Sequence, residues 1–318
     1  MDSPGAFFTT LLDATTVAGL YFVVASGFTL IFGLMRVVNM AHGSLFLLGG
    51  YVAYELQQDW AGGIPGFGLS SAQVSLRNWL LPAVIAALCI AAAGLLMQQF
   101  FLRWNQGQDL RQALITIAIS VILADQMLEH FPGVAVDIAW PGTGSLGFDR
   151  RLDTHIFSVS YSLPRLVILL MAVIIGIALW LWLKRTRTGM VIRAGVDDRQ
   201  MVSALGVNIQ LVFAVAFLVG AALAGFGGAV GGSFGGLAPG DDGRWLLNAL
   251  IVVIIGGMGS LTGAAIGSLL YGFVTQFSAV YLPAIGNECC TQYSTILTFA
   301  LLTVVLAVRP LGLFGRPA

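Results

Sequence analysis

Three polar residues, Asn39, His42 and Ser44, stand between the first long apolar run of the sequence and the start of a second one. A break ahead of a helix leaves backbone N–H groups without partners and directs the positive end of the helix dipole at that point. A carboxylate or an amide of a bound solute would suit such a place. We therefore predict that Asn39, His42, Gly43 and Ser44 line a path for a polar solute.

The same residues also have a purely structural interpretation. Asn39 and Ser44 are residue types that cap the first turn of a helix, here one that starts near Ala41. His42 could simply pack close to the inner membrane surface. For Asn39 and His42 taken singly the sequence favours this interpretation, so the predicted path depends on the segment as a whole.

A second polar stretch, residues 184–206, separates two long apolar runs. Four of its first ten residues are Lys or Arg, so it must lie in water, and such cations mark the cytoplasmic side of a membrane. We expect a break at Thr188-Gly189 and a short helix over 193–205 that Gly206 closes. The segment either docks a cytoplasmic partner or is an ordinary loop with snorkelling ends.

The sequence has no constellation of residues for covalent catalysis. It lacks the His and Cys spacings of a zinc site and the glycine-rich motif that cradles the phosphates of ATP. Adjacent residues seldom form a relaxed disulfide, so we interpret Cys289 and Cys290 as incidental thiols near the membrane surface. We expect no metal, no cofactor and no ATP hydrolysis by this chain itself.

The composition is that of an integral membrane protein. The 318 residues are 58% hydrophobic and 9% charged, whereas soluble domains carry about 25% charged residues. The 40 glycines predict a helix bundle in which backbones approach closely. A formal net charge of zero gives no sign of nucleic-acid binding, and the acidic N-terminus lacks the basic start of a cleavable signal peptide.

The apolar runs predict about eight crossings of the membrane, with the N-terminus outside. Residues 130–162 then form a long periplasmic loop, and the glycine-rich residues 231–244 form another outer loop. Of the 15 Lys and Arg residues, this orientation places ten inside and five outside, as the positive-inside rule requires.

Two apolar segments, 41–54 and 246–255, are short for a crossing and could be half-helices. Each lies near a glycine–methionine pair, and the sequence around Gly43 resembles that around Gly267. Paired interrupted segments in two halves of a transporter often mark the permeation site, although a chance similarity among small residues is the alternative. The predicted path therefore also includes Gly257, Gly259 and Gly267.

Three motifs together resemble a known family, the permeases of branched-chain amino acid ABC importers. Residues 36–43 read Arg-Val-Val-Asn-Met-Ala-His-Gly and look like the N-terminal signature of that family. Thr188-Gly189, Arg193-Ala194 and residues 204–208 resemble its cytoplasmic coupling segment, and residues 256–264 resemble a third signature. The motifs stand in the family's order, and the match is closer to the LivH type than to the LivM type.

The resemblance implies an all-α membrane protein with a type II-like ABC importer fold, in which residues 1–318 form one permease domain in the bacterial inner membrane. It also implies a heterodimer with a second, related permease, two cytoplasmic ATPase subunits and a periplasmic solute-binding protein. Residues 184–206 would then couple the permease to an ATPase. The residues expected to do so are Thr188, Gly189, Arg193, Ala194, Asp197, Ala204, Leu205 and Gly206.

The resemblance leaves the substrate open, because the family transports leucine, isoleucine and valine, other amino acids, amides, urea and some aromatic acids. An ATP-independent channel or secondary transporter for a small polar solute would also explain the apolar runs and half-helices. It would not explain a structured basic segment over 184–206. A membrane enzyme is a third class, but the sequence places no paired acid, base or metal cluster at one depth.

Overall fold

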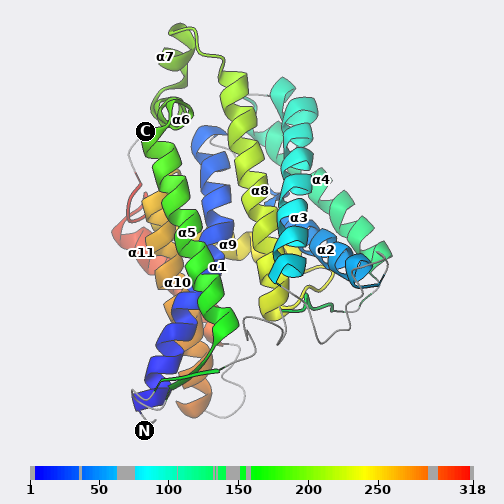
Figure 1. Ribbon diagram of the computed structural model, residues 1–318. Coiled ribbons are helices and arrows are strands. Elements are labelled where there is room, and N and C mark those ends of the chain that lie inside the picture. Colours follow the sequence, from blue (N-terminus) through cyan, green and yellow to red (C-terminus); the bar gives the residue numbers. More distant parts are fainter. Residues whose placement is uncertain are drawn as a thin grey trace.

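The computed structural model describes residues 4–35, 38–62, 76–105, 107–131, 133, 135–140, 151–154, 159–285 and 293–315. The chain forms a bundle of long helices with a small β-hairpin at the end that carries the N-terminus (Figure 1). The helices are α1 (Pro4–Met35), α2 (His42–Gly62), α3 (Leu76–Met97), α4 (Asp109–His130), α5 (Leu163–Arg185), α6 (Arg187–Asp197), α7 (Arg199–Ala204), α8 (Ile209–Gly235), α9 (Asp242–Gly256), α10 (Leu261–Ile285) and α11 (Tyr293–Val308). A π-helical turn, η1 (Gln98–Leu102), and a 3-10 turn, η2 (Arg103–Asn105), extend α3. The strands β1 (Arg151–Thr154) and β2 (Val159–Ser162) pair antiparallel, with Arg151 opposite Ser162.

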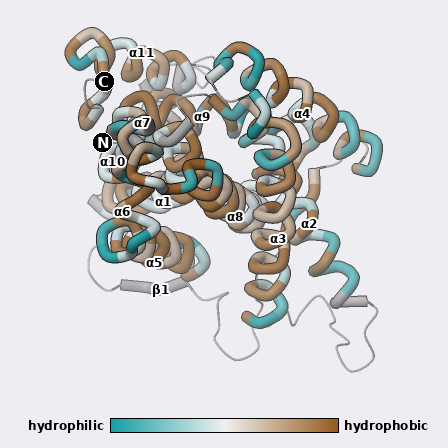
Figure 2. Tube along the Cα trace, turned by 90° about the horizontal axis from the view of Figure 1, so that it is seen from above, coloured by the Kyte–Doolittle hydropathy of each residue, from teal (hydrophilic) through white to brown (hydrophobic). Residues whose placement is uncertain are grey.

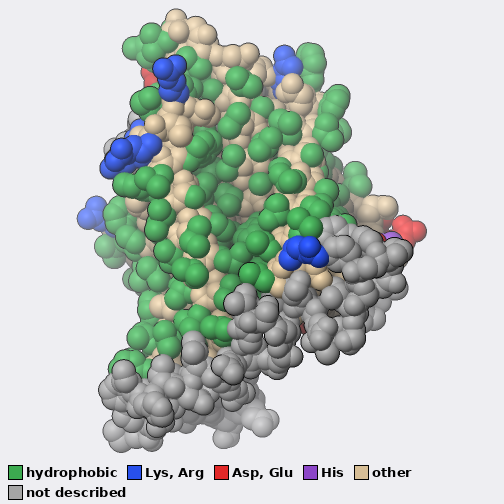
Figure 3. Space-filling view, viewed as in Figure 1, with side chains coloured by type: hydrophobic (Ala, Val, Ile, Leu, Met, Phe, Trp, Pro, Cys, Tyr) green, Lys and Arg blue, Asp and Glu red, His purple; other side chains and the backbone are tan. Residues whose placement is uncertain are grey.

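Within the described residues, six helices are long and apolar enough to cross a membrane, namely α1, α3, α4, α5, α8 and α10. The helices α2, α9 and α11 are shorter or less apolar. The predicted class, a helical multi-pass membrane protein, is therefore confirmed. Figure 3 shows several Lys and Arg side chains towards the end that carries α6 and α7, beside a broad hydrophobic face.

Glycines bring the backbones of the central helices into direct contact. Seen from above, α1, α8 and α9 lie between a group formed by α5, α10 and α11 and a group formed by α2, α3 and α4 (Figure 2). A Cβ atom at Gly49 on α2 would lie 2.7 Å from the carbonyl oxygen of Gly225 on α8. A Cβ at Gly228 on α8 would lie 2.8 Å from the amide nitrogen of Gly50. Small residues permit this spacing, so α8 is the element on which α2 rests.

The two short apolar segments differ in the structure. Residues 41–54 belong to a longer helix of 21 residues, α2, which is not among the six candidate membrane spans. The second segment is a short helix, because α9 has only 15 residues and ends where Gly257 adopts a φ of 102°. Only glycine takes that backbone conformation without strain.

The basic segment forms two helices rather than one. The predicted break at Thr188-Gly189 is wrong, because the Thr186 side chain accepts a hydrogen bond from the Gly189 amide (3.0 Å) and starts α6 there. The breaks lie instead at Thr186, between α5 and α6, and at Asp198, between α6 and α7. Gly206 has a φ of 80° and follows α7, as the sequence predicted.

The described part of the predicted outer loop is held against the bundle. Val136 bridges to Leu237 after α8, and the Gln57 side chain both donates to and accepts from the backbone of Ala139. The Trp140 ring stacks on Trp79 of α3 at 5.2 Å. Residues 141–150 of this loop, and Cys289 and Cys290, lie outside the described residues.

Candidate translocation site

The start of α2 is buried inside the bundle. Asn39 Oδ1 accepts a hydrogen bond from the Ala41 amide (3.1 Å), so Asn39 does cap the helix. His42 is fully buried, and its Nε2 lies 3.1 Å from the carbonyl oxygen of Val24 on α1. A carbonyl oxygen only accepts, so Nε2 carries the proton. His42 therefore packs within the bundle, against α1.

Ser44, in the first turn of α2, joins three helices. Its Oγ lies 2.7 Å from the Oγ of Ser120 on α4 and 2.8 Å from Oδ2 of Asp242, the first residue of α9. Ser120 stands midway along α4, which is a candidate membrane span. The start of α9 therefore reaches the depth of the middle of α4, whereas the sequence had placed residues 231–244 in an outer loop.

Gly43 explains how α2 and α9 come so close. A Cβ atom at this position would overlap the Asp242 carbonyl oxygen and would lie 2.8 Å from Leu246 Cβ. On the other side of α9, a Cβ at Gly267 of α10 would overlap the Val252 carbonyl oxygen. The short helix α9 is therefore held between the start of α2 and the body of α10.

The predicted path residues fall into two groups. Asn39, His42, Gly43 and Ser44 lie together at the start of α2. Gly257 and Gly259 follow the other end of α9 and have φ values of 102° and 84°. A helix of the length of α9 spans about 22 Å. These glycines therefore shape the α9–α10 connection and are not part of the Ser44 cluster, which consists of Ser44, Ser120 and Asp242.

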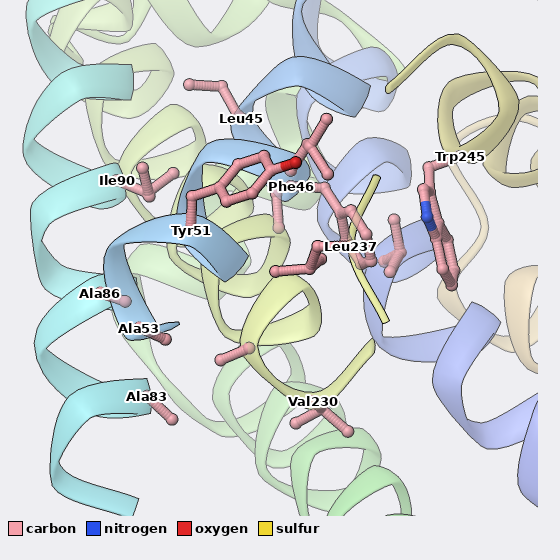
Figure 4. Packing of buried hydrophobic residues seen from close by; sticks show 14 of the residues in the cluster. Leu45, Phe46, Tyr51, Ala53, Ala83, Ala86, Ile90, Val230, Leu237 and Trp245 are labelled. Carbon is pink, nitrogen blue, oxygen red and sulfur yellow. The ribbon is translucent and has the colours of Figure 1, made fainter. Parts of the chain in front are cut away.

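Aromatic side chains beside this cluster escaped the sequence reasoning. Phe46 on α2 and Trp245 on α9 are buried, with ring centres 4.2 Å apart (Figure 4). Tyr21 on α1 packs on Trp245 at 5.4 Å and accepts a hydrogen bond from Asn248 Nδ2 (3.0 Å). The only signal in the sequence was the presence of Tyr21 and Asn248 within apolar runs.

Buried amides surround the connection between α1 and α2 on its other side. The Met40 amide donates to Thr116 Oγ1 on α4 (3.2 Å), and Gln112 Nε2 donates to the Asn105 carbonyl (2.6 Å). A small space of about 10 Å³ lies between Asn39, Gln112 and Thr116, which is the size of one water molecule. The Met40 hydrogen bond therefore fixes the start of α2 to α4, and the Gln112 hydrogen bond joins α4 to η2.

The segment formed by α6 and α7 presents apolar side chains to its surroundings. Met190, Met201 and Leu205 are more than half exposed, while Ile192 and Val202 are buried. Gly189 fixes α6 to the end of α5, because a Cβ there would lie 2.5 Å from Leu183 Cα. Of the residues predicted to couple to an ATPase, the exposed ones are Thr188, Arg193, Ala194, Ala204, Leu205 and Gly206; Gly189 is buried, and the Asp197 side chain lies outside the description.

In the described ranges, no group of three or more His, Cys, Asp or Glu side chains could hold a metal ion. Charged side chains at the end of the bundle that carries the N-terminus form an ion pair. Asp13 on α1 forms an ion pair with Arg165 at the start of α5, and Tyr161 bonds to Thr16 (2.8 Å). The chemistry of the described interior is thus hydrogen bonding and charge, in the Ser44 cluster above all.

The chain matches a family model described as "Branched-chain amino acid transport system / permease component" over residues 10–306. The high-affinity branched-chain amino acid transport system permease protein LivH of Salmonella typhimurium is 30% identical over 98% of this chain and 96% of LivH. The corresponding permease protein BraD of Pseudomonas aeruginosa is 28% identical over 96% of this chain and 95% of BraD.

The permease protein LivM of Escherichia coli is more distant, at 24% identity over 95% of this chain and 69% of LivM. The expected closer similarity to the LivH type is therefore confirmed. A solved structure, PsaBC from Streptococcus pneumoniae in complex with Fab, aligns with 95% of this chain and 92% of that chain at a TM-score of 0.46 and 8% identity, which is too distant to support an argument. By the family model and these relatives, the chain belongs to the family of branched-chain amino acid transport system permease components.

Proposed function

We propose that this chain is a permease subunit of an ATP-binding cassette importer in the bacterial inner membrane, and forms half of a pathway for branched-chain or related amino acids. The observation that carries the proposal is the α6–α7 segment. It stands at the end of the bundle with several Lys and Arg side chains, is fixed to α5 through Gly189, and exposes Met190, Met201 and Leu205. An exposed apolar group on a water-facing element suits docking to another protein.

The packing supplies a route from this segment to the Ser44 cluster. The segment connects α5 to α8, and α8 touches α2 backbone to backbone at Gly225 and Gly228. A displacement of α6–α7 by an ATPase would therefore move α8, and α8 would move the start of α2 against α9. Close-packed glycine contacts transmit such a displacement because they leave no space for side chains to absorb it.

The complex would contain a second permease, two cytoplasmic ATPase subunits and a periplasmic solute-binding protein. The similarity to both LivH and LivM, each named as a permease protein of a branched-chain amino acid transport system, supports a pair of related permeases. The same partners distinguish this proposal from an ATP-independent channel or secondary transporter, which needs none of them. No metal or cofactor has a role in this chain under the proposal.

A pair of matched leucines tests the docking role. Leu205 after α7 and Leu110 at the start of α4 are both 76% exposed. In complexes reconstituted into liposomes, Leu205→Asp should lower both amino-acid uptake and stimulated ATP hydrolysis by tenfold or more, which corresponds to about 1.4 kcal/mol of lost docking energy. Leu110→Asp serves as the control and should stay close to wild type. Equal behaviour of the two variants would show that docking lies elsewhere.

A further inference from the structure

The carboxylate of Asp242, a half-buried residue, lies where α2, α4 and α9 meet. It accepts a hydrogen bond from Ser44 Oγ (2.8 Å), because a carboxylate only accepts. Ser44 Oγ in turn lies 2.7 Å from Ser120 Oγ, so the Ser120 hydroxyl donates to Ser44. Since Ser120 stands midway along α4, this chain of two hydroxyls ends on a carboxylate near the middle of the membrane.

The surroundings of Asp242 stabilise a negative charge without neutralising it. Asp242 lies in the first turn of α9, where the helix dipole favours an anion. The neighbouring Arg244 pairs with Asp241 (3.0 Å) and not with Asp242, which forms no ion pair in the described part of the chain. Its Oδ1 likewise makes no hydrogen bond with any described residue. A charge at this depth is costly, which points to a cation that binds there transiently.

The neighbouring side chains suit an ammonium group that carries an apolar substituent. Phe46 lies two residues after Ser44 on α2 and packs on Trp245, which lies three residues after Asp242 on α9; Tyr21 lies against Trp245. Aromatic faces attract a cation through their quadrupole and also accommodate an aliphatic side chain. The Trp245 indole N–H is buried and has no partner among the described residues, so it remains available to donate to a carboxylate.

We propose that Asp242 receives the ammonium group of an α-amino acid on its way through the pathway, with Ser44 and Ser120 orienting the Asp242 carboxylate. The inference rests on the proposed transport function and narrows it. An α-amino acid brings the positive charge that Asp242 lacks, whereas urea and simple amides are neutral and would leave this carboxylate unpaired. The site is thus selective for substrates with a free ammonium group.

Neutralising the carboxylate tests this assignment. Asp242→Asn keeps the size of the side chain and its bond with Ser44, and removes only the charge. In liposomes that hold the complex with its partner subunits, leucine uptake by this variant should fall at least about tenfold, as expected for a lost hydrogen bond to a charged group. The adjacent Asp241→Asn is the control and should keep uptake within twofold. Basal ATP hydrolysis should stay within twofold of wild type in the Asp241→Asn control.

The outcomes separate this inference from the proposed function. A wild-type complex that imports no amino acid would contradict the transport function and the inference with it. If Asp242→Asn takes up leucine as wild type does, the inference is overturned and the transport function stands. The same holds if Asp241→Asn loses as much uptake as Asp242→Asn. If Asp242→Asn does not assemble, Ser120→Ala replaces it: uptake should fall about threefold, the range for a neutral hydrogen bond, and unchanged uptake would overturn the assignment.

Discussion

Adding one methyl group at Gly43 should separate α2 from α9. In Gly43→Ala the new Cβ would overlap the Asp242 carbonyl oxygen and would lie 2.8 Å from Leu246 Cβ. Carbon atoms in ordinary contact are about 3.5–4.0 Å apart, so α9 must shift by roughly 1 Å, which is enough to stretch the 2.8 Å bond between Ser44 and Asp242. Overpacking of this kind costs about 1–3 kcal/mol.

Gly243→Ala is the matched control, because it adds the same methyl group one residue beyond Asp242 where no atom lies within 4 Å. Alanine in a helix is more stable than glycine by about 0.5–1 kcal/mol, so this variant should be as stable as wild type or more so. The assay is the thermal midpoint of the purified complex in detergent, together with ATP-driven uptake. We expect Gly43→Ala to have a lower thermal midpoint and a lower ATP-driven uptake than wild type. If Gly43→Ala and Gly243→Ala behave alike, the close packing of α2 on α9 is refuted.

Two further predictions concern the ends of the bundle. A Cβ at position 189 would lie 2.5 Å from Leu183 Cα, so Gly189→Val should push α6 away from α5. Uptake should fall far more than the amount of inserted protein. Normal uptake would contradict a rigid connection between α6 and α5. Burial raises the pKa of Tyr161 from 10 to about 12. Because the folded-state pKa is the higher one, the associated stability is present below pH 10 and is lost as the pH rises from 10 towards 12. Over this range the thermal midpoint of wild type should fall more steeply than that of Tyr161→Phe, and parallel curves would disprove this role of Tyr161.

Local signals in the sequence predicted the long helices and some of their ends. The apolar runs identified the spanning helices because a membrane span needs many consecutive apolar residues. Gly206 was correctly predicted to end a helix, since its φ of 80° favours glycine. The glycine content correctly predicted backbone contacts such as that of Gly49 with Gly225.

Features that depend on distant contacts could not be predicted. Asp242 stands in a polar, glycine-rich stretch that reads as an outer loop, but Ser44, 198 positions away, holds it within the bundle. The break expected at Gly189 was wrong for a related reason. A glycine that permits close packing on Leu183 looks the same in the sequence as one that ends a helix, and the cap from Thr186 decided the local structure.

The central claim is that this chain moves an amino acid only when partner ATPases drive it through α6–α7. The direct measurement is leucine uptake into liposomes that contain either the complex with its co-purifying subunits or this chain alone, with and without ATP. We predict uptake only in liposomes that contain the complex and are supplied with ATP. Leucine uptake by this chain alone in the absence of ATP would contradict the account and favour a channel or secondary transporter.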